Sequence, residues 1–182
     1  EMLAEIARFW VSRAEFDKSR DEGRGRYVIR GVIGPDEFHS GYPDRPYDGV
    51  DNNAYTNVMA VWAIVRALDA LDALPLRDRL DLMETLGIRG RELDRWDEVS
   101  RRMYVPFHEG VISQFEGYAD LLELDWHGLR ARHGDIARLD RILEAEGDTP
   151  NRYKASKQAD VLMLFYLLSA DELRGLLERL GY

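Results

Sequence analysis

The sequence predicts a mainly helical fold with one or two short strands. Apolar residues recur at three- and four-residue steps along about seven segments, only one stretch is rich in β-branched residues, and no repeat of fixed period divides the chain. No linker-like composition interrupts the sequence, so residues 1–182 are expected to form a single unit. Helix faces near both ends lack predicted neighbours, which indicates a unit truncated at both ends.

The N-terminal part predicts one helix and one strand. Leu3, Ile6 and Trp10 share one helical face, which predicts a helix to about residue 16. The charged stretch 17–26 contains two glycines and predicts a loop. Tyr27–Ile33 is rich in β-branched residues and ends at a Gly-Pro pair, which is typical of a short strand.

The remaining elements follow from periodicity and from stop signals. Residues 36–50 lack a sustained period and predict a structured loop, of the kind that often carries function. Ser169 with Glu172 forms a capping box for the last helix. The other helices are expected from Asp51 or Asn52 to Pro75, over Leu76–Leu86, Glu92–Tyr104, weakly near Asp120–Leu124, around Ile136–Leu143, and over Lys154–Leu168, which is apolar all round from Val161.

Charge and cysteine content limit the classes of function. The chain has 34 acidic and 25 basic residues, a net charge of −9, so a nucleic-acid partner is not expected. The longest apolar run, Val161–Leu168, is shorter than the roughly 20 residues that cross a bilayer, so no membrane partner is expected. The absence of cysteine excludes disulfides, thiolate metal sites and a cysteine nucleophile. No signal-peptide pattern is visible in residues 1–10, and a cytoplasmic location is expected.

One segment combines acidic and imidazole groups. Asp36, Glu37 and His39 follow the predicted strand and the Gly-Pro turn. If apolar neighbours desolvate Glu37, its pKa rises and it can act as a general acid, which the cleavage of a glycosidic bond requires. The alternative is that Asp36 caps a turn and Glu37 is a solvated loop residue. The spacing matches no established metal site, so no metal is expected.

Two further polar segments are candidates for binding sugar. Asp51–Asn57, which includes Asn53, concentrates amide, hydroxyl and carboxylate groups at a helix start, where the alternative is an ordinary cap with an exposed polar face. Lys157 and Gln158 precede the apolar helix, where the alternative is a lysine that extends its charge into solvent. Asp36, His39 and Asn53, together with Lys157 and Gln158, are the candidate substrate-binding residues.

The motifs Gly31–His39, Val50–Asn57 and Lys157–Val161 resemble, in order along the chain, the central region of glycoside hydrolase family 65, which includes maltose, trehalose and kojibiose phosphorylases. Phe9–Arg13 and Ile112–Tyr118 support the resemblance. It implies that the chain is part of an (α/α)6 barrel, a six-hairpin toroid. It also implies that Glu37 is the general acid.

The same resemblance implies that Lys157 and Gln158 contact sugar in the donor subsite. The longer protein that would contain this chain, called the parent here, is then expected to cleave an α-glucosyl disaccharide with inorganic phosphate as co-substrate. The reaction inverts the anomeric carbon and gives β-glucose 1-phosphate. No metal or organic cofactor is expected. Phosphate takes the place of the water and catalytic base of an inverting hydrolase. Position 38 is Phe where the family commonly has Tyr, a mild departure.

Two alternatives remain open at this point. One is a hydrolase of the same family, in which water and a second carboxylate replace phosphate. The other is a non-catalytic helical scaffold or sugar-binding module.

The family's upstream donor-site segment and downstream phosphate loop are missing from this sequence, so the chain alone is expected to be inactive. A homodimer is one candidate for the assembly of the parent.

Overall fold

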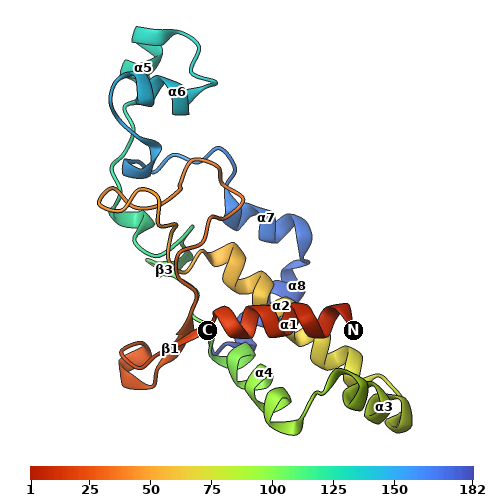
Figure 1. Cartoon of the computed structure of the whole chain (residues 1–182). Coiled ribbons are helices and arrows are strands. Elements are labelled where there is room, and N and C mark those ends of the chain that lie inside the picture. Colours follow the sequence, from red (N-terminus) through yellow and green to blue (C-terminus); the bar gives the residue numbers. More distant parts are fainter. The chain divides into compact units, whose positions relative to one another are not determined.

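The computed structural model describes residues 1–182 and is mainly helical, with eight α-helices and two small antiparallel two-stranded sheets (Figure 1). This confirms the predicted fold class, although the strands number four and have two or three residues each. None of the helices combines the length and the apolar composition that a membrane crossing requires.

The chain divides into two compact units, which are described separately. The helical unit comprises Glu1–Ile29, Thr56–Val105 and Leu164–Tyr182, and the loop unit comprises Arg30–Tyr55 and Pro106–Met163. Helices α2 (Ala54–Asp72) and α7 (Asp160–Leu167) begin in the loop unit and continue in the helical unit. The expectation that residues 1–182 form a single domain stays a prediction.

The helical unit follows the sequence pattern closely. Helix α3 has the predicted bounds and ends at Gly87, whose φ of 64° is left-handed. Ser169 caps α8 by accepting a hydrogen bond from the Glu172 N–H at 3.1 Å, as predicted. The elements that lie wholly in this unit are α1 (Met2–Arg13), β1 (Glu15–Asp17), η1 (Asp21–Gly23), β2 (Arg26–Val28), α3 (Leu76–Leu86), α4 (Gly90–Arg102) and α8 (Ala170–Arg179).

Helix α1 ends earlier than predicted because its last expected residues belong to a sheet. Phe16 pairs with Tyr27 in the antiparallel β1–β2 ladder, so the backbone after Arg13 is extended. The predicted strand Tyr27–Ile33 is correspondingly short, since β2 ends at Val28. Large side chains buried in this unit come from its helices, from β2 and from the residue that follows α4: Tyr27, Val58, Val61, Ile64, Trp96, Val99 and Met103.

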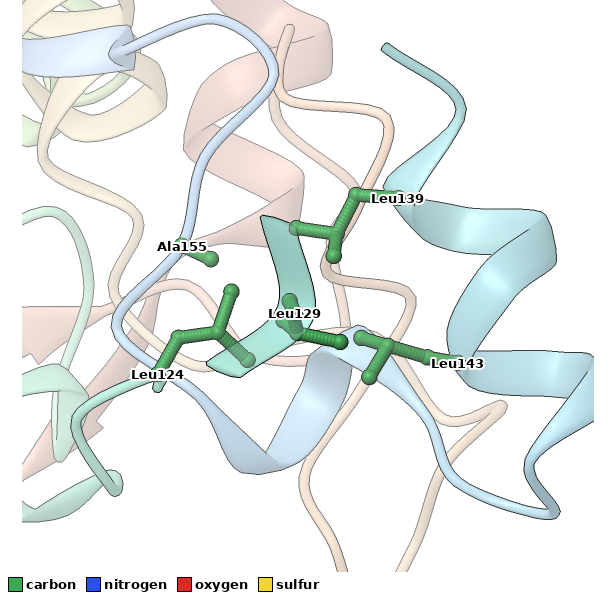
Figure 2. Packing of buried hydrophobic residues seen from close by; sticks show 5 residues of the cluster. All are labelled: Leu124, Leu129, Leu139, Leu143 and Ala155. Atoms are coloured by element: carbon green, nitrogen blue, oxygen red, sulfur yellow. The ribbon is translucent and has the colours of Figure 1, made fainter. Parts of the chain in front are cut away.

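The loop unit contains short elements joined by long irregular segments. Its elements are β3 (Phe107–His108), β4 (Val111–Ile112), η2 (Tyr118–Asp120), α5 (Trp126–His133), α6 (Leu139–Ala145) and η3 (Pro150–Arg152). A small apolar cluster holds α5 and α6 together, and Figure 2 shows the side chains of Leu129, Leu139 and Leu143 pointing toward one another, with Leu124 and Ala155 alongside.

Two predictions for the loop unit are wrong, and one helix was missed. The helix expected near Asp120–Leu124 is absent, because Leu122 pairs with Tyr153 in an isolated bridge. Helix α5 was not predicted; it is only eight residues long, and Asp125 caps it by accepting a hydrogen bond from the Gly128 N–H at 2.9 Å. Helix α7 begins at Asp160, not at Lys154, because the preceding backbone bonds to other segments instead of to itself.

Candidate active site

The segment Gly31–His39 is fixed by contacts on both sides of the Gly-Pro turn. Val32 and Val50 exchange two backbone hydrogen bonds, of 3.0 and 2.8 Å. At Gly34, an added Cβ would lie 2.1 Å from Asp160 Oδ2 and 2.5 Å from Asn53 Nδ2. Glycine at this position therefore lets the turn lie directly against the Asn53–Asp160 pair.

Asp36 is a buried carboxylate that joins two distant segments. Its Oδ1 accepts hydrogen bonds from the backbone N–H of Lys157 at 2.9 Å and of Phe38 at 3.2 Å. Its Oδ2 lies 2.8 Å from His39 Nδ1. Burial alone raises the pKa of Asp36, but the hydrogen bonds from His39, Lys157 and Phe38 outweigh burial and lower that pKa below its ordinary value. Asp36 is therefore an ionised hub and not an exposed side chain.

His39 completes this hub. Its ring is buried, and its Nε2 lies 3.0 Å from the Tyr153 carbonyl oxygen. Both ring nitrogens face oxygens that can only accept, the Asp36 carboxylate and a backbone carbonyl, so the ring is held between two acceptors.

Glu37 differs from its neighbours because its side chain is exposed, at 62%. Lys157 Nζ lies 2.5 Å from Glu37 Oε2, and Gln158 Nε2 lies 3.5 Å from Glu37 Oε1. The hydrogen bond from Lys157, followed by that from Gln158, lowers the pKa of Glu37. The expectation that apolar neighbours desolvate Glu37 and raise its pKa is therefore wrong.

Asn53 is buried beside another carboxyl group. Its Nδ2 donates to Asp160 Oδ2 at 2.7 Å, and the other oxygen of Asp160, Oδ1, is buried without a hydrogen-bond partner. Burial raises the pKa of Asp160, and Asn53 opposes that rise. The motif that begins at Asp51 is thus not an exposed polar rim: Asn52 is buried too, and its Nδ2 donates to Glu116 Oε2 at 2.7 Å.

All six predicted site residues, Asp36, Glu37, His39, Asn53, Lys157 and Gln158, belong to the loop unit. Glu37, Lys157 and Gln158 form one group, in which the side chains of Lys157 and Gln158 each contact Glu37. Asp36, His39 and Asn53 are buried and bonded internally, which supports a positioning role; their contact with sugar stays a prediction.

Sequence reasoning missed three positions that hold this site together. Gln114 accepts from the Val161 N–H at 3.3 Å through its side chain and from the Ala54 N–H at 3.0 Å through its carbonyl oxygen. Gly34, Gln114 and Asp160 lie inside the motifs Gly31–His39, Ile112–Tyr118 and Lys157–Val161. Their position inside the motifs was the available signal, but their roles depend on contacts between segments more than 100 residues apart.

The chain is similar to known proteins of one family. Residues 1–177 match the family described as glycosyl hydrolase family 65 central catalytic domain. An uncharacterized glycosyl hydrolase of Mycobacterium tuberculosis is 70% identical over the whole chain, which covers 13% of that relative. Trehalose 6-phosphate phosphorylase of Lactococcus lactis is 35% identical over the whole chain, which covers 22% of that relative.

A solved structure of a candidate kojibiose phosphorylase from the human microbiome is similar as well. It has a TM-score of 0.67 and 26% sequence identity over 91% of this chain, and the match covers 21% of that structure. The chain therefore spans a small part, between 13% and 22%, of the proteins that it is similar to in these comparisons.

Proposed function

We infer the function from one premise, that this chain belongs to glycosyl hydrolase family 65 as part of its central catalytic domain, an (α/α)6 barrel. We propose that the parent protein cleaves an α-glucosyl disaccharide by inverting phosphorolysis to β-glucose 1-phosphate, with Glu37 as general acid. In this reaction the glycosidic C–O bond breaks, the proton of Glu37 passes to the leaving oxygen, and a phosphate oxygen bonds to the anomeric carbon.

One observation carries the proposal, the group formed by exposed Glu37 and Lys157 and half-buried Gln158 on a buried polar support. An exposed carboxyl group beside an ammonium and an amide offers the donors and acceptors that sugar hydroxyls need. Gln158 Oε1 is buried and has no hydrogen-bond partner in the protein, so one acceptor of this group is left unsatisfied.

Proton donation requires a change at Lys157. While Lys157 bonds to Glu37, the pKa of Glu37 is lowered and the carboxyl group holds its proton weakly. A sugar that takes over the hydrogen bonds of Lys157 and Gln158 removes this effect, and it also excludes water from the carboxyl group. Both changes raise the pKa of Glu37 toward the range in which a general acid works.

Hydrolysis is the second candidate, and one observation favours it. The charge of Asp140 is the smallest of the influences on Glu37 and raises its pKa slightly, so a second carboxylate acts on this group. An inverting hydrolase needs such a group to activate water. Asp140 is paired with Arg138, at 2.9 Å between Oδ2 and Nη2, which holds it ionised.

Phosphate dependence separates the two reactions. The full-length parent is incubated with maltose, trehalose or kojibiose, with and without phosphate, and the products are identified by NMR. Phosphorolysis predicts β-glucose 1-phosphate and little turnover without phosphate, and it predicts that Asp140→Asn retains activity. Phosphate-independent release of glucose that is lost in Asp140→Asn would establish the hydrolase instead.

A further inference from the structure

We propose that Asp36 is a positioning residue, a buried clamp that holds the backbone of Glu37 and of Lys157 in the register that acid catalysis needs. The proposal rests on the proposed function, because it assigns to Asp36 a role that acts through Glu37. It gives Asp36 a role other than contact with sugar.

The clamp is built from two backbone contacts on a single oxygen. Asp36 Oδ1 accepts from the N–H of Phe38, the residue after Glu37, and from the N–H of Lys157, the residue whose ammonium group meets Glu37. These two N–H groups are 119 positions apart in sequence, from residue 38 to residue 157. Because one oxygen binds both peptide N–H groups, the backbone at Glu37 and the backbone at Lys157 keep a fixed position relative to each other. The Glu37 carboxyl group and the Lys157 ammonium group extend from these two positions.

Burial makes this contact specific. Asp36 is 2% exposed, whereas the side chains of Glu37 and Lys157 that it serves are 62% and 48% exposed. An exposed ion pair between two long side chains is weak and mobile by itself. Its geometry therefore depends on the backbone below it, and the buried hydrogen bonds to Asp36 are what hold that backbone.

His39 holds Asp36 in turn. Its Nδ1 faces Asp36 Oδ2 at 2.8 Å, and its Nε2 is fixed by the Tyr153 carbonyl oxygen at 3.0 Å. The carboxylate of Asp36 thus accepts from three donors, two from the backbone and one from the ring. Alanine at position 36 leaves all three donors without this acceptor. Asparagine retains an oxygen for both N–H groups, and its amide can donate to a neutral His39 ring, so the clamp persists without the charge.

The leaving group reports whether acid catalysis has been damaged. An α-glucosyl disaccharide needs a proton on its leaving oxygen, whereas α-glucosyl fluoride releases fluoride with little help from an acid. We define the acid ratio as kcat/KM for the disaccharide divided by kcat/KM for α-glucosyl fluoride, both with phosphate. A general loss of folding, or of binding to the glucosyl unit that both substrates share, lowers both values and leaves the ratio unchanged.

The experiment compares Asp36→Ala and Asp36→Asn with wild type in the full-length parent. Asp36→Ala is expected to lower the acid ratio by about 10-fold or more, toward the value of Glu37→Gln, because removing a general acid from its position costs up to about 10²–10⁴ in rate. Asp36→Asn is expected to retain the ratio within about threefold, because its oxygen still accepts both backbone N–H groups.

Asn151→Ala is the matched control. Asn151 is also 2% exposed and in the loop unit, and it bonds to Ser40 and to the Pro46 carbonyl oxygen, away from Glu37 and Lys157. We expect it to lower the thermal midpoint while the acid ratio stays at the wild-type value. Should Asp36→Ala fail to fold, His39→Gln, which removes the ring from Oδ2 and leaves both contacts on Oδ1, is expected to lower the ratio by a smaller factor.

Equal losses on both substrates in Asp36→Ala, or a wild-type ratio in His39→Gln, would overturn the clamp. So would an Asp36→Asn variant that falls as far as Asp36→Ala. These results are distinct from failure of the proposed function, because only that failure gives Glu37→Gln a wild-type ratio.

Discussion

The helical unit and the loop unit bury different kinds of side chain. Seven buried polar residues belong to the loop unit, namely Asp36, His39, Asn52, Asn53, Gln114, Asn151 and Asp160. Four belong to the helical unit, namely Arg26, Thr56, Asn57 and Ser100. The helical unit relies instead on large apolar groups, of which Trp96 and Ile64 are almost completely buried.

Backbone geometry accounts for this difference. A helix satisfies its own N–H and C=O groups, so its buried face can be apolar. The irregular segments of the loop unit leave backbone groups that side chains must satisfy, as Asp36 does for Phe38 and Lys157. Hydrogen bonds are directional, so a buried polar support can fix an irregular site loop more specifically than apolar contacts can.

The largest expected effect comes from adding one methyl group to a glycine in each unit. Gly34→Ala is expected to lower the free energy of unfolding by about 1–3 kcal/mol, because its Cβ would meet both Asp160 and Asn53. Gly175→Ala, in α8 with open space around the added atom, is expected to raise it by about 0.5–1 kcal/mol through helix propensity. Urea unfolding and disaccharide turnover of the full-length parent measure both variants. A Gly34→Ala protein with wild-type stability and turnover would contradict the tight packing of the turn.

A smaller effect on stability is expected from a change of pH, and its direction differs between the two buried carboxyl groups of the loop unit. Burial raises the pKa of Asp160 above its ordinary value of 3.8, so its contribution to stability is complete below that value and is lost as pH rises through the raised pKa. Asp36 has the opposite sign: its lowered pKa gives stability that is present above its ordinary value and is lost as pH falls through the lowered pKa.

Asp160→Asn removes the ionisation and can retain the hydrogen bond from Asn53. We therefore expect the stability of this variant relative to wild type to rise as pH increases from 4 toward 7. The gain in the free energy of unfolding is about 1.4 kcal/mol for each unit of pKa shift that is removed, and the thermal midpoint rises with it. Melting curves of both proteins across this range give the difference. Two pH profiles that run parallel would show that the Asp160 carboxyl group is not desolvated.

The sequence predicted the elements whose signals are local. The bounds of α3 follow from Leu76 to the stop at Gly87, and the cap of α8 follows from Ser169. It failed where distant segments decide the local structure: Lys154 is not helical, because its N–H donates to the Leu122 carbonyl oxygen at 2.8 Å. Helical periodicity contains no information about that contact.

The site divides in the same way. Glu37, Lys157 and Gln158 were predicted as candidates, and the structure brings them into contact. The electrostatic environment of Glu37 was predicted wrongly, because the prediction relied on apolar neighbours such as Phe38, whereas the group with the largest effect on the pKa of Glu37 is Lys157, 120 positions away. The burial of Asp36 and His39 was equally invisible in the sequence, since it depends on Tyr153 and on the Lys157 peptide.

The most direct test of the central claim, that Glu37 is the proton donor of a glycoside-cleaving site, is the leaving-group dependence of a Glu37→Gln parent. With phosphate present, kcat/KM for the α-glucosyl disaccharide is predicted to fall by about 10²–10⁴, while turnover of α-glucosyl fluoride stays within about tenfold of wild type. A Glu37→Gln protein that cleaves the disaccharide as fast as wild type would contradict the account.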